Sequence, residues 1–507
     1  MGSVELHYLL YNKVDINVKK SFELFLNNIK KIAKNKIINI INLLRWIMNS
    51  FWNERRENEE FSKLNRNIEV DVGIIGGGLA GISTAYYLSK NGLKVAVLEK
   101  NKLCSCTTGG STGKITSQHG IIYKYLKDIN GRDYSKKYYE ANEEALHNIQ
   151  KITKEENIDC DLEVKNAYVY TESDKEVQTI KQEFECTKKL DIKSEFVNKI
   201  DLPIDICGAI KFENQAQFDP VKYTYGLANC IQKNSGKIFE NSKVIDVVED
   251  DGKYNISTKE GSIRAKYLVI ATRYPIIKFP GYYFIKMYQS TSYALIVDTH
   301  TDLNFDGYYI NQETPKFSFR TVKDGDRNLL LVVGYDYKTG TEIVGNPFEY
   351  LEAKVKKMYP KAEILKSWTA EDCISLDKIP YIGDFSDIMD NCYVATGFNK
   401  WGITSSNIAA NIIKDKIFGV ENKYEHLFES SRLGIIKNKD EMMNMLKEAG
   451  EGIILERIKG KPTPTCTHLG CKLSWNPIEE IWECSCHGSK FSKRGFVIEG
   501  PAVNDLE

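Results

Sequence analysis

The hydrophobic and polar positions change their period along the chain. Between residues 20 and 50, apolar side chains recur at spacings of three and four, which predicts an amphipathic helix with a largely basic and amide-rich opposite face. Residues 68–75 are mostly apolar and β-branched, which is typical of a buried parallel strand. A helical pattern over residues 82–88 and a second strand over residues 93–98 follow, so an α/β unit begins here.

Four later apolar segments have the composition and length of strands. They cover residues 167–170, 293–297, 316–320 and 329–333. We expect these segments to pair in an antiparallel sheet, set between the segments of the α/β part and forming a domain of its own.

Charge and composition exclude two classes of protein. The 507 residues include 69 Lys and Arg and 69 Asp and Glu, so the formal net charge is zero and no basic face marks a dedicated nucleic-acid binder. A hydrophobic fraction of 42% can offset the entropy of folding, which excludes disorder for most of the chain. The average hides one segment, because residues 1–49 carry a net charge of +5 and the remaining 458 residues carry −5.

The basic amphipathic segment permits two interpretations. Such a helix can lie in a membrane interface, where apolar burial and anionic lipids both favour it. It can equally pack on the protein's own body or on a partner. We expect no signal peptide and no membrane-spanning helix, and the eight scattered cysteines favour a reducing compartment. These features predict a cytoplasmic protein, held at the inner face of the membrane if residues 20–50 bind lipid.

A glycine-rich turn joins the first predicted strand to the first predicted helix. Gly76 would permit the tight turn, Gly78 would let a pyrophosphate approach the backbone, and Gly81 would allow close packing of helix on strand. Glu99 follows Gly76 by 23 residues, at the end of the second strand, where it would accept hydrogen bonds from an adenosine ribose. The complete context predicts a dinucleotide site.

Cysteine and histidine gather near the C-terminus. Two short motifs, Cys466-x-His468 and Cys484-x-x-His487, supply two thiolates and two imidazoles from two loops, which indicates a metal site. A Cys₂His₂ set suits zinc by ligand count.

Several later segments indicate, through their resemblance to a known family, which dinucleotide binds at the glycine turn. Together with the glycine turn they resemble the D-amino-acid-oxidase-like FAD family, which includes glycine oxidase and sarcosine oxidase, over roughly residues 68–420. The segments cover residues 216–220, 243–246, 267–272, 376–383 and 393–404. The resemblance implies FAD, bound by a two-domain Rossmann-like fold with an interleaved antiparallel substrate domain.

The family's site residues carry over onto matching positions. The resemblance implies that Thr108 and Ser111 belong to a loop that wraps the flavin, and that the flavin ring and the rest of the dinucleotide contact Val244, Ala271, Gly397, Trp401, Gly402 and Thr404. Three candidate catalytic residues have alternatives. Lys400 would add positive charge beside the flavin, or be a solvated loop lysine. Arg320 would bind a substrate carboxylate, or pair with a surface acid, and His119 would face the flavin or bond a local carbonyl.

The C-terminal motifs resemble the Rieske [2Fe-2S] proteins. The resemblance implies that Cys466 and Cys484 bind one iron and that His468 and His487 bind the other, which raises the reduction potential above that of plant-type ferredoxins. It also implies a disulfide between Cys471 and Cys486. Phe491 stands where high-potential members have a tyrosine donor, so one hydrogen bond to the cluster is missing. Zinc remains the alternative.

The two resemblances together predict a bacterial flavin–Rieske fusion. We expect a basic helical extension, a flavoprotein, a linker and a Rieske domain over residues 1–52, 68–430, 431–455 and 456–507. Within the flavoprotein, the dinucleotide-binding parts would cover about 68–125, 210–275 and 365–420, and the substrate domain about 150–205 and 280–365.

The predicted activity is an FAD-dependent dehydrogenase of an amine or amino-acid-like C–N bond. Its electrons would pass through the Rieske cluster to an acceptor, either a protein or a quinone. Two alternatives are a membrane-surface, quinone-linked electron carrier and a non-catalytic redox sensor. A small molecule is the expected substrate, and no nucleic acid is expected as a partner.

Overall fold

A computed structural model describes residues 50–55, 60–277, 280–432, 464–468 and 470–506. The chain divides into residues 1–49 and Ser50–Glu507, and the second unit is the one described below. The predicted amphipathic helix, with its possible membrane contact, lies outside the described residues except for Ser50. Among the residues that the structure does describe, no helix is both long and apolar enough to cross a membrane.

The first sheet has eight strands and is built around β1 (Ile68–Ile75). Its parallel strands run in the order β17-β10-β1-β2-β7, with β1 at the centre, buried over its last four residues as its apolar run predicts. The other strands pair antiparallel at the margins. The further strands of this sheet are β2 (Val95–Leu98), β7 (Lys237–Phe239), β8 (Val244–Asp250), β9 (Lys253–Thr258), β10 (Ser262–Ile270), β16 (Tyr381–Asp384) and β17 (Cys392–Thr396).

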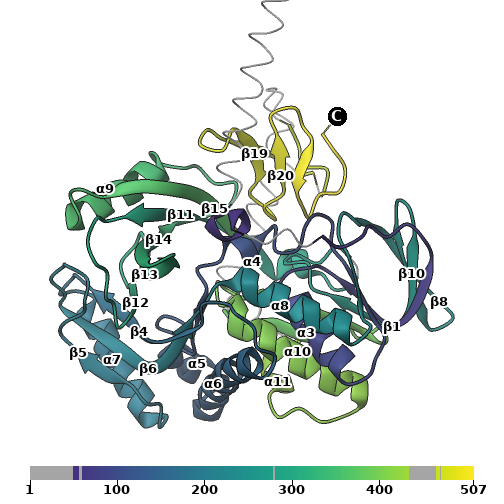
Figure 1. The fold of residues 1–507 in the computed structure, drawn as a ribbon, viewed down its shortest axis with the longest axis horizontal. Helices are drawn as coiled ribbons and strands as arrows, with labels where there is room; N and C mark the ends of the chain where they lie inside the picture. Colours follow the sequence, from purple (N-terminus) through teal and green to yellow (C-terminus); the bar gives the residue numbers. More distant parts are fainter. Residues whose placement is uncertain (1–49, 56–59, 278–279, 433–463, 469, 507) are drawn as a thin grey trace, which may run out of the picture. The chain divides into compact units, whose positions relative to one another are not determined.

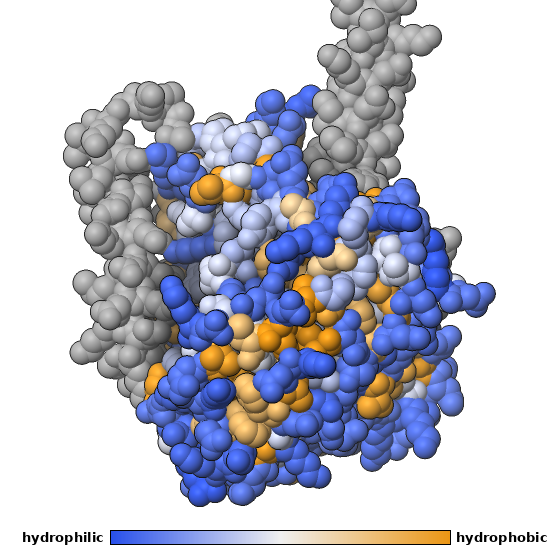
Figure 2. Space-filling view, turned by 90° about the vertical axis from the view of Figure 1, so that its left-hand side faces the viewer, coloured by the Kyte–Doolittle hydropathy of each residue, from blue (hydrophilic) through white to orange (hydrophobic). Residues whose placement is uncertain are grey.

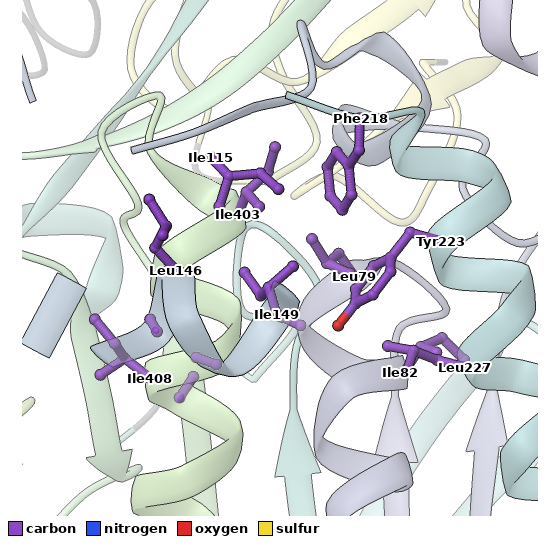
Figure 3. Packing of buried hydrophobic residues seen from close by; sticks show 14 of the residues in the cluster. Leu79, Ile82, Ile115, Leu146, Ile149, Phe218, Tyr223, Leu227, Ile403 and Ile408 are labelled. Carbon is purple, nitrogen blue, oxygen red and sulfur yellow. The ribbon is translucent and has the colours of Figure 1, made fainter. Parts of the chain in front are cut away.

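A layer of helices packs against this sheet. Its members are α3 (Leu79–Lys90), α6 (Arg132–Glu155), α8 (Pro220–Lys233) and α10 (Gly402–Phe418). Figure 3 shows how Leu79 and Ile82 from α3 meet Tyr223 and Leu227 from α8, with Ile403 from α10 nearby. Burying a side chain of this kind contributes about 1.5–3 kcal/mol, so the apolar faces of these helices fix the glycine turn before α3 against the sheet.

The second sheet has nine strands, in the order β15-β11-β14-β13-β12-β4-β6-β3, with β5 beside β6. All pairs are antiparallel except β12 with β4. The four predicted strands all lie in it. The strands are β3 (Lys114–Ile115), β4 (Glu163–Thr171), β5 (Glu195–Val197), β6 (Gly208–Gln217), β11 (Met287–Asp298), β12 (Gly307–Asn311), β13 (Phe317–Asp324), β14 (Arg327–Lys338) and β15 (Glu363–Ser375).

This sheet reaches beyond the ranges expected for a substrate domain. β3 and β6 come from segments assigned to the dinucleotide part, and β15 lies almost wholly in one. β15 pairs with β11 along nearly its whole length, from Met287 opposite Ser375 to Asp298 opposite Glu363. The two domains therefore share strands.

A third, four-stranded antiparallel sheet lies near the C-terminus, drawn in yellow in Figure 1. Leu473, Phe491 and Ala502 form its small core together with four cysteines. Its strands are β18 (Leu473–Asn476), β19 (Ile481–Cys484), β20 (Lys490–Ser492) and β21 (Val497–Glu499). β20 lies against β15, where Lys490 contacts Glu371.

Short elements complete the described residues. They are α2 (Phe51–Glu54), α4 (Thr107–Gly110), α5 (Tyr123–Asn130), α7 (Val177–Lys189), a 3₁₀ turn η1 (Tyr283–Ile285), α9 (Pro347–Met358) and α11 (Glu425–Phe428). The face in Figure 2 is mostly hydrophilic, with hydrophobic residues in small groups between charged ones. Exposed apolar residues that stand among charged ones are ordinary for a protein surface.

Candidate functional site

A cavity of about 1120 Å³ lies where the carboxyl ends of the parallel strands face the second sheet and the third. This volume is slightly above the usual range of small-molecule sites, about 300–1,000 Å³. Four groups of wall residues come from the turn after β1, the segment after β2, the ends of β8 and β10, and the segment before α10. A fifth group, residues 497–503, comes from the third sheet and the chain after it.

The glycine turn at one end of the cavity has no room for side chains. Gly76 has φ +115°, and a Cβ there would lie 2.4 Å from the Ala271 carbonyl oxygen. A Cβ on Gly81 would lie 2.0 Å from the Gly76 carbonyl oxygen, so helix α3 packs directly on the turn. Gly78 precedes α3 without a capping side chain, and Thr108 Oγ1 accepts a hydrogen bond from Leu79 N at 3.0 Å. A helix N-terminus whose N-cap residue has no side chain suits a phosphate group.

Glu99 lines the cavity beside this turn. Its carboxylate accepts hydrogen bonds from Gly77 N at 2.8 Å and from Asn101 N at 2.9 Å. Burial raises the pKa of the Glu99 carboxyl above its usual range, and these two backbone donors oppose the shift. Val244 and Ala271 also line the wall. The donor and acceptor set fits a dinucleotide; the ribose contact of Glu99 stays a prediction.

The opposite end of the cavity is formed by the segment before α10. Gly397 has φ +68°, and Asn399 and Lys400 also adopt left-handed conformations, so the chain turns sharply before the helix begins at Gly402. Lys400 lies on the wall, where its Nζ donates to Ser292 Oγ at 2.8 Å and lies 3.5 Å from Asp372 Oδ2. It is therefore a paired lysine facing the cavity, rather than one held only by solvent.

His119 lines the same end, stacked on Trp401 with ring centroids 4.6 Å apart. Its two ring nitrogens contact Tyr138 Oη at 2.8 Å and the Thr116 carbonyl oxygen at 2.9 Å. Burial lowers the pKa of His119 to about 3, so the ring is neutral at physiological pH. The histidine both faces the cavity and bonds a local carbonyl. Thr404 lies behind it, with Oγ1 3.4 Å from His119 Nε2, and does not reach the wall.

The structure corrects the expectation for Arg320. Its guanidinium is buried away from the cavity wall, donating to the Gly113 carbonyl oxygen at 2.9 Å and to the Phe218 carbonyl oxygen at 3.3 Å. The guanidinium also lies 5.4 Å from the ring of Trp52. Arg320 therefore links the loop that carries Ser111 to Phe218, the residue after β6. It is not placed to bind a substrate carboxylate. Ser111 itself lines the cavity and accepts from Gly113 N at 3.1 Å.

The four predicted metal ligands come together in the third sheet. Cys466 and Cys484 are buried and carry no disulfide, and Cys484 interacts directly with the Cys466 thiol. His468 Nδ1 lies 3.3 Å from His487 Nδ1. The Phe284 carbonyl oxygen, which can only accept, lies 3.0 Å from His487 Nε2, so the proton sits on Nε2 and the Nδ1 lone pair faces the site. This pairing of two thiols and two imidazoles fits a [2Fe-2S] cluster with mixed ligation.

A disulfide joins the two ligand loops. It links Cys471 to Cys486, with Cα atoms 6.5 Å apart. The Cys484 sulfur lies within 4.8 Å of both disulfide sulfurs, but bonded sulfurs are not thiolate ligands, so these three do not form a second metal site.

A chain of buried ion pairs connects the third sheet to the rest of the molecule, and no motif had pointed to it. Arg273 lies 3.1 Å from Glu499 and 3.3 Å from Glu371. Lys490 lies 2.5 Å from the other oxygen of Glu371 and 3.2 Å from Glu479. Glu371 on β15 therefore bridges Arg273, which follows β10, and Lys490 on β20.

Two glycines bring the backbones of the interface close together. Gly340 has φ +83°, and a Cβ there would lie 2.3 Å from Ser485 N. A Cβ on Gly488 would lie 2.6 Å from Gln289 Cβ, and Gln289 Nε2 donates to the His487 carbonyl oxygen at 2.5 Å. The loop that carries His487 is thus held directly against β11.

The cavity and the cluster ligands share a wall. Tyr274, which lines the cavity, has its ring centroid 6.0 Å from that of His487 and 6.3 Å from that of His468. Residues 497–503, beyond the ligand loops, line the same cavity.

Known proteins match both parts of the chain. The DAO family of FAD dependent oxidoreductases matches residues 71–416, and the Rieske [2Fe-2S] domain matches residues 457–507. The Rieske 2Fe-2S iron-sulfur protein YhfW of Bacillus subtilis (strain 168) is 33% identical over 90% of this chain and 97% of its own. Gamma-glutamylputrescine oxidoreductase of Escherichia coli (strain K12) is 22% identical over 72% of this chain and 87% of its own.

A solved structure shares the fold of the flavin part. Glycine oxidase from Geobacillus kaustophilus superposes with a TM-score of 0.62 at 18% identity, covering 72% of this chain and 99% of its own. The Rieske match covers all four predicted metal ligands, and this domain implies a [2Fe-2S] cluster rather than zinc. The chain therefore belongs to the DAO family of FAD-dependent oxidoreductases and carries a C-terminal Rieske [2Fe-2S] domain.

Proposed function

We propose that this oxidoreductase is a dehydrogenase of an amine or amino-acid-like C–N bond. Such an oxidation removes a hydride from carbon and a proton from nitrogen. Bound FAD supplies the two-electron acceptor, and the Rieske cluster supplies a one-electron carrier toward an acceptor protein or quinone. The wall that the cavity shares with the predicted cluster ligands supports the electron-transfer step of this proposal, because it brings the two redox sites into one interface.

The residues of the cavity support this use. The N-terminal N–H groups of α3 would bind the pyrophosphate, Glu99 the ribose, and the loop of Thr108 and Ser111 would cover the flavin. The start of α10 at Gly402 would place a second positive helix end beside the flavin ring, where negative charge develops on reduction. These assignments rest on the cavity lining and on the family's binding pattern.

The charges on the cavity wall support a nitrogen-containing substrate. Asp336 and Asp372 offer carboxylates for an ammonium group, and Lys400 and Lys378 offer ammonium groups for an anion. Lys400 is held toward the cavity by Ser292 and Asp372. The related proteins named for glycine and for gamma-glutamylputrescine also point to amino or amine compounds.

An anaerobic titration of the full-length holoprotein with amines and amino acids tests the proposal. The absorbance of flavin and cluster should fall together as substrate is added. A Cys466→Ser variant loses a predicted cluster ligand. Substrate should still reduce its flavin, but electron transfer from this variant to ferricenium, an artificial one-electron acceptor, should slow strongly. A flavin that stays oxidised with every such compound would refute the C–N substrate. Reduction of flavin alone in the wild type would refute the proposed direction of electron flow.

A further inference from the structure

The phenol of Tyr274 is buried between the two redox sites without a hydrogen-bond partner. The residue follows β10 in the flavin domain and is 6% exposed. Among the residues that the structure describes, no donor or acceptor bonds its hydroxyl group. A buried hydroxyl is costly to leave unsatisfied, so an orphan of this kind in a native fold calls for a partner that protein atoms do not provide.

The surroundings of this phenol identify the partner by its chemistry. The Tyr274 ring meets His468 and His487 edge-on, at centroid distances of 6.3 Å and 6.0 Å. The Cys484 and Cys373 thiols are the ionisable groups close enough to act on it electrostatically. The Tyr274 side chain therefore lies beside three of the four predicted cluster ligands, with its ring against His468 and His487 and with the Cys484 thiol among its ionisable neighbours.

We propose that Tyr274 donates a hydrogen bond to a sulfur of the [2Fe-2S] site, at Cys484 Sγ or the adjoining cluster sulfur. Hydrogen bonds to these sulfurs stabilise the reduced cluster, which carries one more negative charge, and so raise its reduction potential. Tyr274 is a positioning and tuning residue in this role. The flavin domain thereby sets the potential of a cluster whose ligands all belong to another domain.

Residue 491 of the Rieske domain cannot act as a second hydrogen-bond donor of this kind. Phe491 is fully buried among the cysteines of the domain core and has no polar atom. Ser489 is also buried, and its Oγ accepts from Ala502 N at 3.0 Å, which leaves one hydroxyl proton to donate. Ser489 thus offers a side-chain hydroxyl within the Rieske domain, and Tyr274 would add another across the interface.

The potential should therefore depend on domain docking. When the interface is intact, the donor is in place and the cluster is the better electron acceptor. Separation of the domains would remove the donor and lower the potential. The inference does not rest on the proposed C–N substrate, because the potential is measured without any substrate.

The test is an anaerobic redox titration of full-length Tyr274→Phe, followed by EPR for the cluster and by absorbance for the flavin. The cluster potential should fall by about 59 mV, which corresponds to a tenfold change in the one-electron equilibrium. Tyr170→Phe is the matched control, because its hydroxyl is also buried without a partner but lies on β4, in the second sheet. It should leave the cluster potential unchanged.

A second change at the same position works in the opposite direction. Site-specific Tyr274→3-fluorotyrosine makes the phenol a stronger donor, so the potential should rise, which a merely structural residue would not cause. An unchanged cluster potential in both proteins would overturn the proposal. So would a shift confined to the flavin potential, since the hydroxyl would then serve the flavin. If Tyr274→Phe fails to retain its cluster, the fluorinated protein decides alone.

Discussion

Arg273 and Glu499 form an ion pair across the interface between the flavin domain and the Rieske domain. Arg273 Nη2 lies 3.1 Å from Glu499 Oε1, and the two side chains are only 14% and 12% exposed. The Arg273 guanidinium lowers the pKa of the Glu499 carboxyl to about 2, against the opposing effect of burial. The pair is therefore charged at neutral pH, and it holds the wall of the cavity formed by residues 497–503.

Glu499→Gln should weaken the docking of the Rieske domain. Removing one charge of a buried pair leaves the partner incompletely compensated, at a cost of about 3 kcal/mol. Thermal unfolding followed by the visible circular dichroism of the cluster measures the loss. Glu260→Gln is the control, because the pair of Glu260 with Lys63 is about half exposed and should contribute less than about 1 kcal/mol. Equal losses in the two variants would contradict the role of the buried pair.

The stability of the interface should fall as the pH rises toward neutrality. Burial raises the pKa of Glu479 from 4.5 to about 7, although Lys490 opposes the shift. The folded protein therefore binds one proton more than the unfolded chain between these values, and the unfolding free energy decreases through this window by about 3 kcal/mol at most.

Glu479→Gln tests this pH dependence, because the amide cannot titrate. Unfolding curves at pH about 5 and about 8 should differ less in the variant than in the wild type. The variant should be relatively more stable at the higher pH. A pH dependence identical in both proteins would assign the effect to other groups.

Gly340→Ala should destabilise the interface between the flavin domain and the Rieske domain, because the added methyl group would clash with the Rieske backbone. The new Cβ would lie 2.3 Å from Ser485 N, and the residue has φ +83°. Gly345→Ala is a matched control, with φ +78° and open space around its Cβ. In both variants, an alanine in the left-handed conformation should lower the free energy of unfolding by about 1 kcal/mol. Gly340→Ala should lose a further 1–3 kcal/mol or so through overpacking, and its flavin-to-cluster electron transfer should slow in stopped-flow reduction. Indistinguishable variants would argue against the close contact.

Arg320→Leu should lower stability and leave substrate affinity unchanged. The Phe218 carbonyl oxygen loses its guanidinium donors, and an unsatisfied buried acceptor costs about 1–3 kcal/mol. Thermal unfolding measures the first effect, and KM of the folded protein at low temperature measures the second. Arg327→Leu, which breaks an exposed pair with Asp298, is the control. A large rise in KM at full stability would restore Arg320 to the substrate site.

Local sequence was enough for the parts of the site that are local in the chain. The glycines of the turn after β1 and the two Cys–His motifs work through their immediate neighbours, so their spacing carries the information. The interface residues lack this property. Arg273, Glu371 and Lys490 follow one another along the chain at intervals of about a hundred residues or more. Each looks like an ordinary surface charge until the tertiary fold buries it.

Arg320 is another residue whose role could not be predicted from local sequence. Its position on a strand of the second sheet is compatible with a role in the cavity and with a role behind it. Only the packing of Trp52 and of the loop at Gly113 decides between them. Tyr274 was missed for a related reason, because its neighbours His468 and His487 lie 194 and 213 residues further along the chain.

The wall formed by residues 497–503 has a consequence for biosynthesis. A ribosome makes the chain from the N-terminus, so this wall leaves the exit tunnel after every other residue that lines the cavity. The nascent flavin domain therefore exists for a time with one side of its cofactor chamber open. Closure of that side waits for the iron–sulfur domain to be translated, folded and docked.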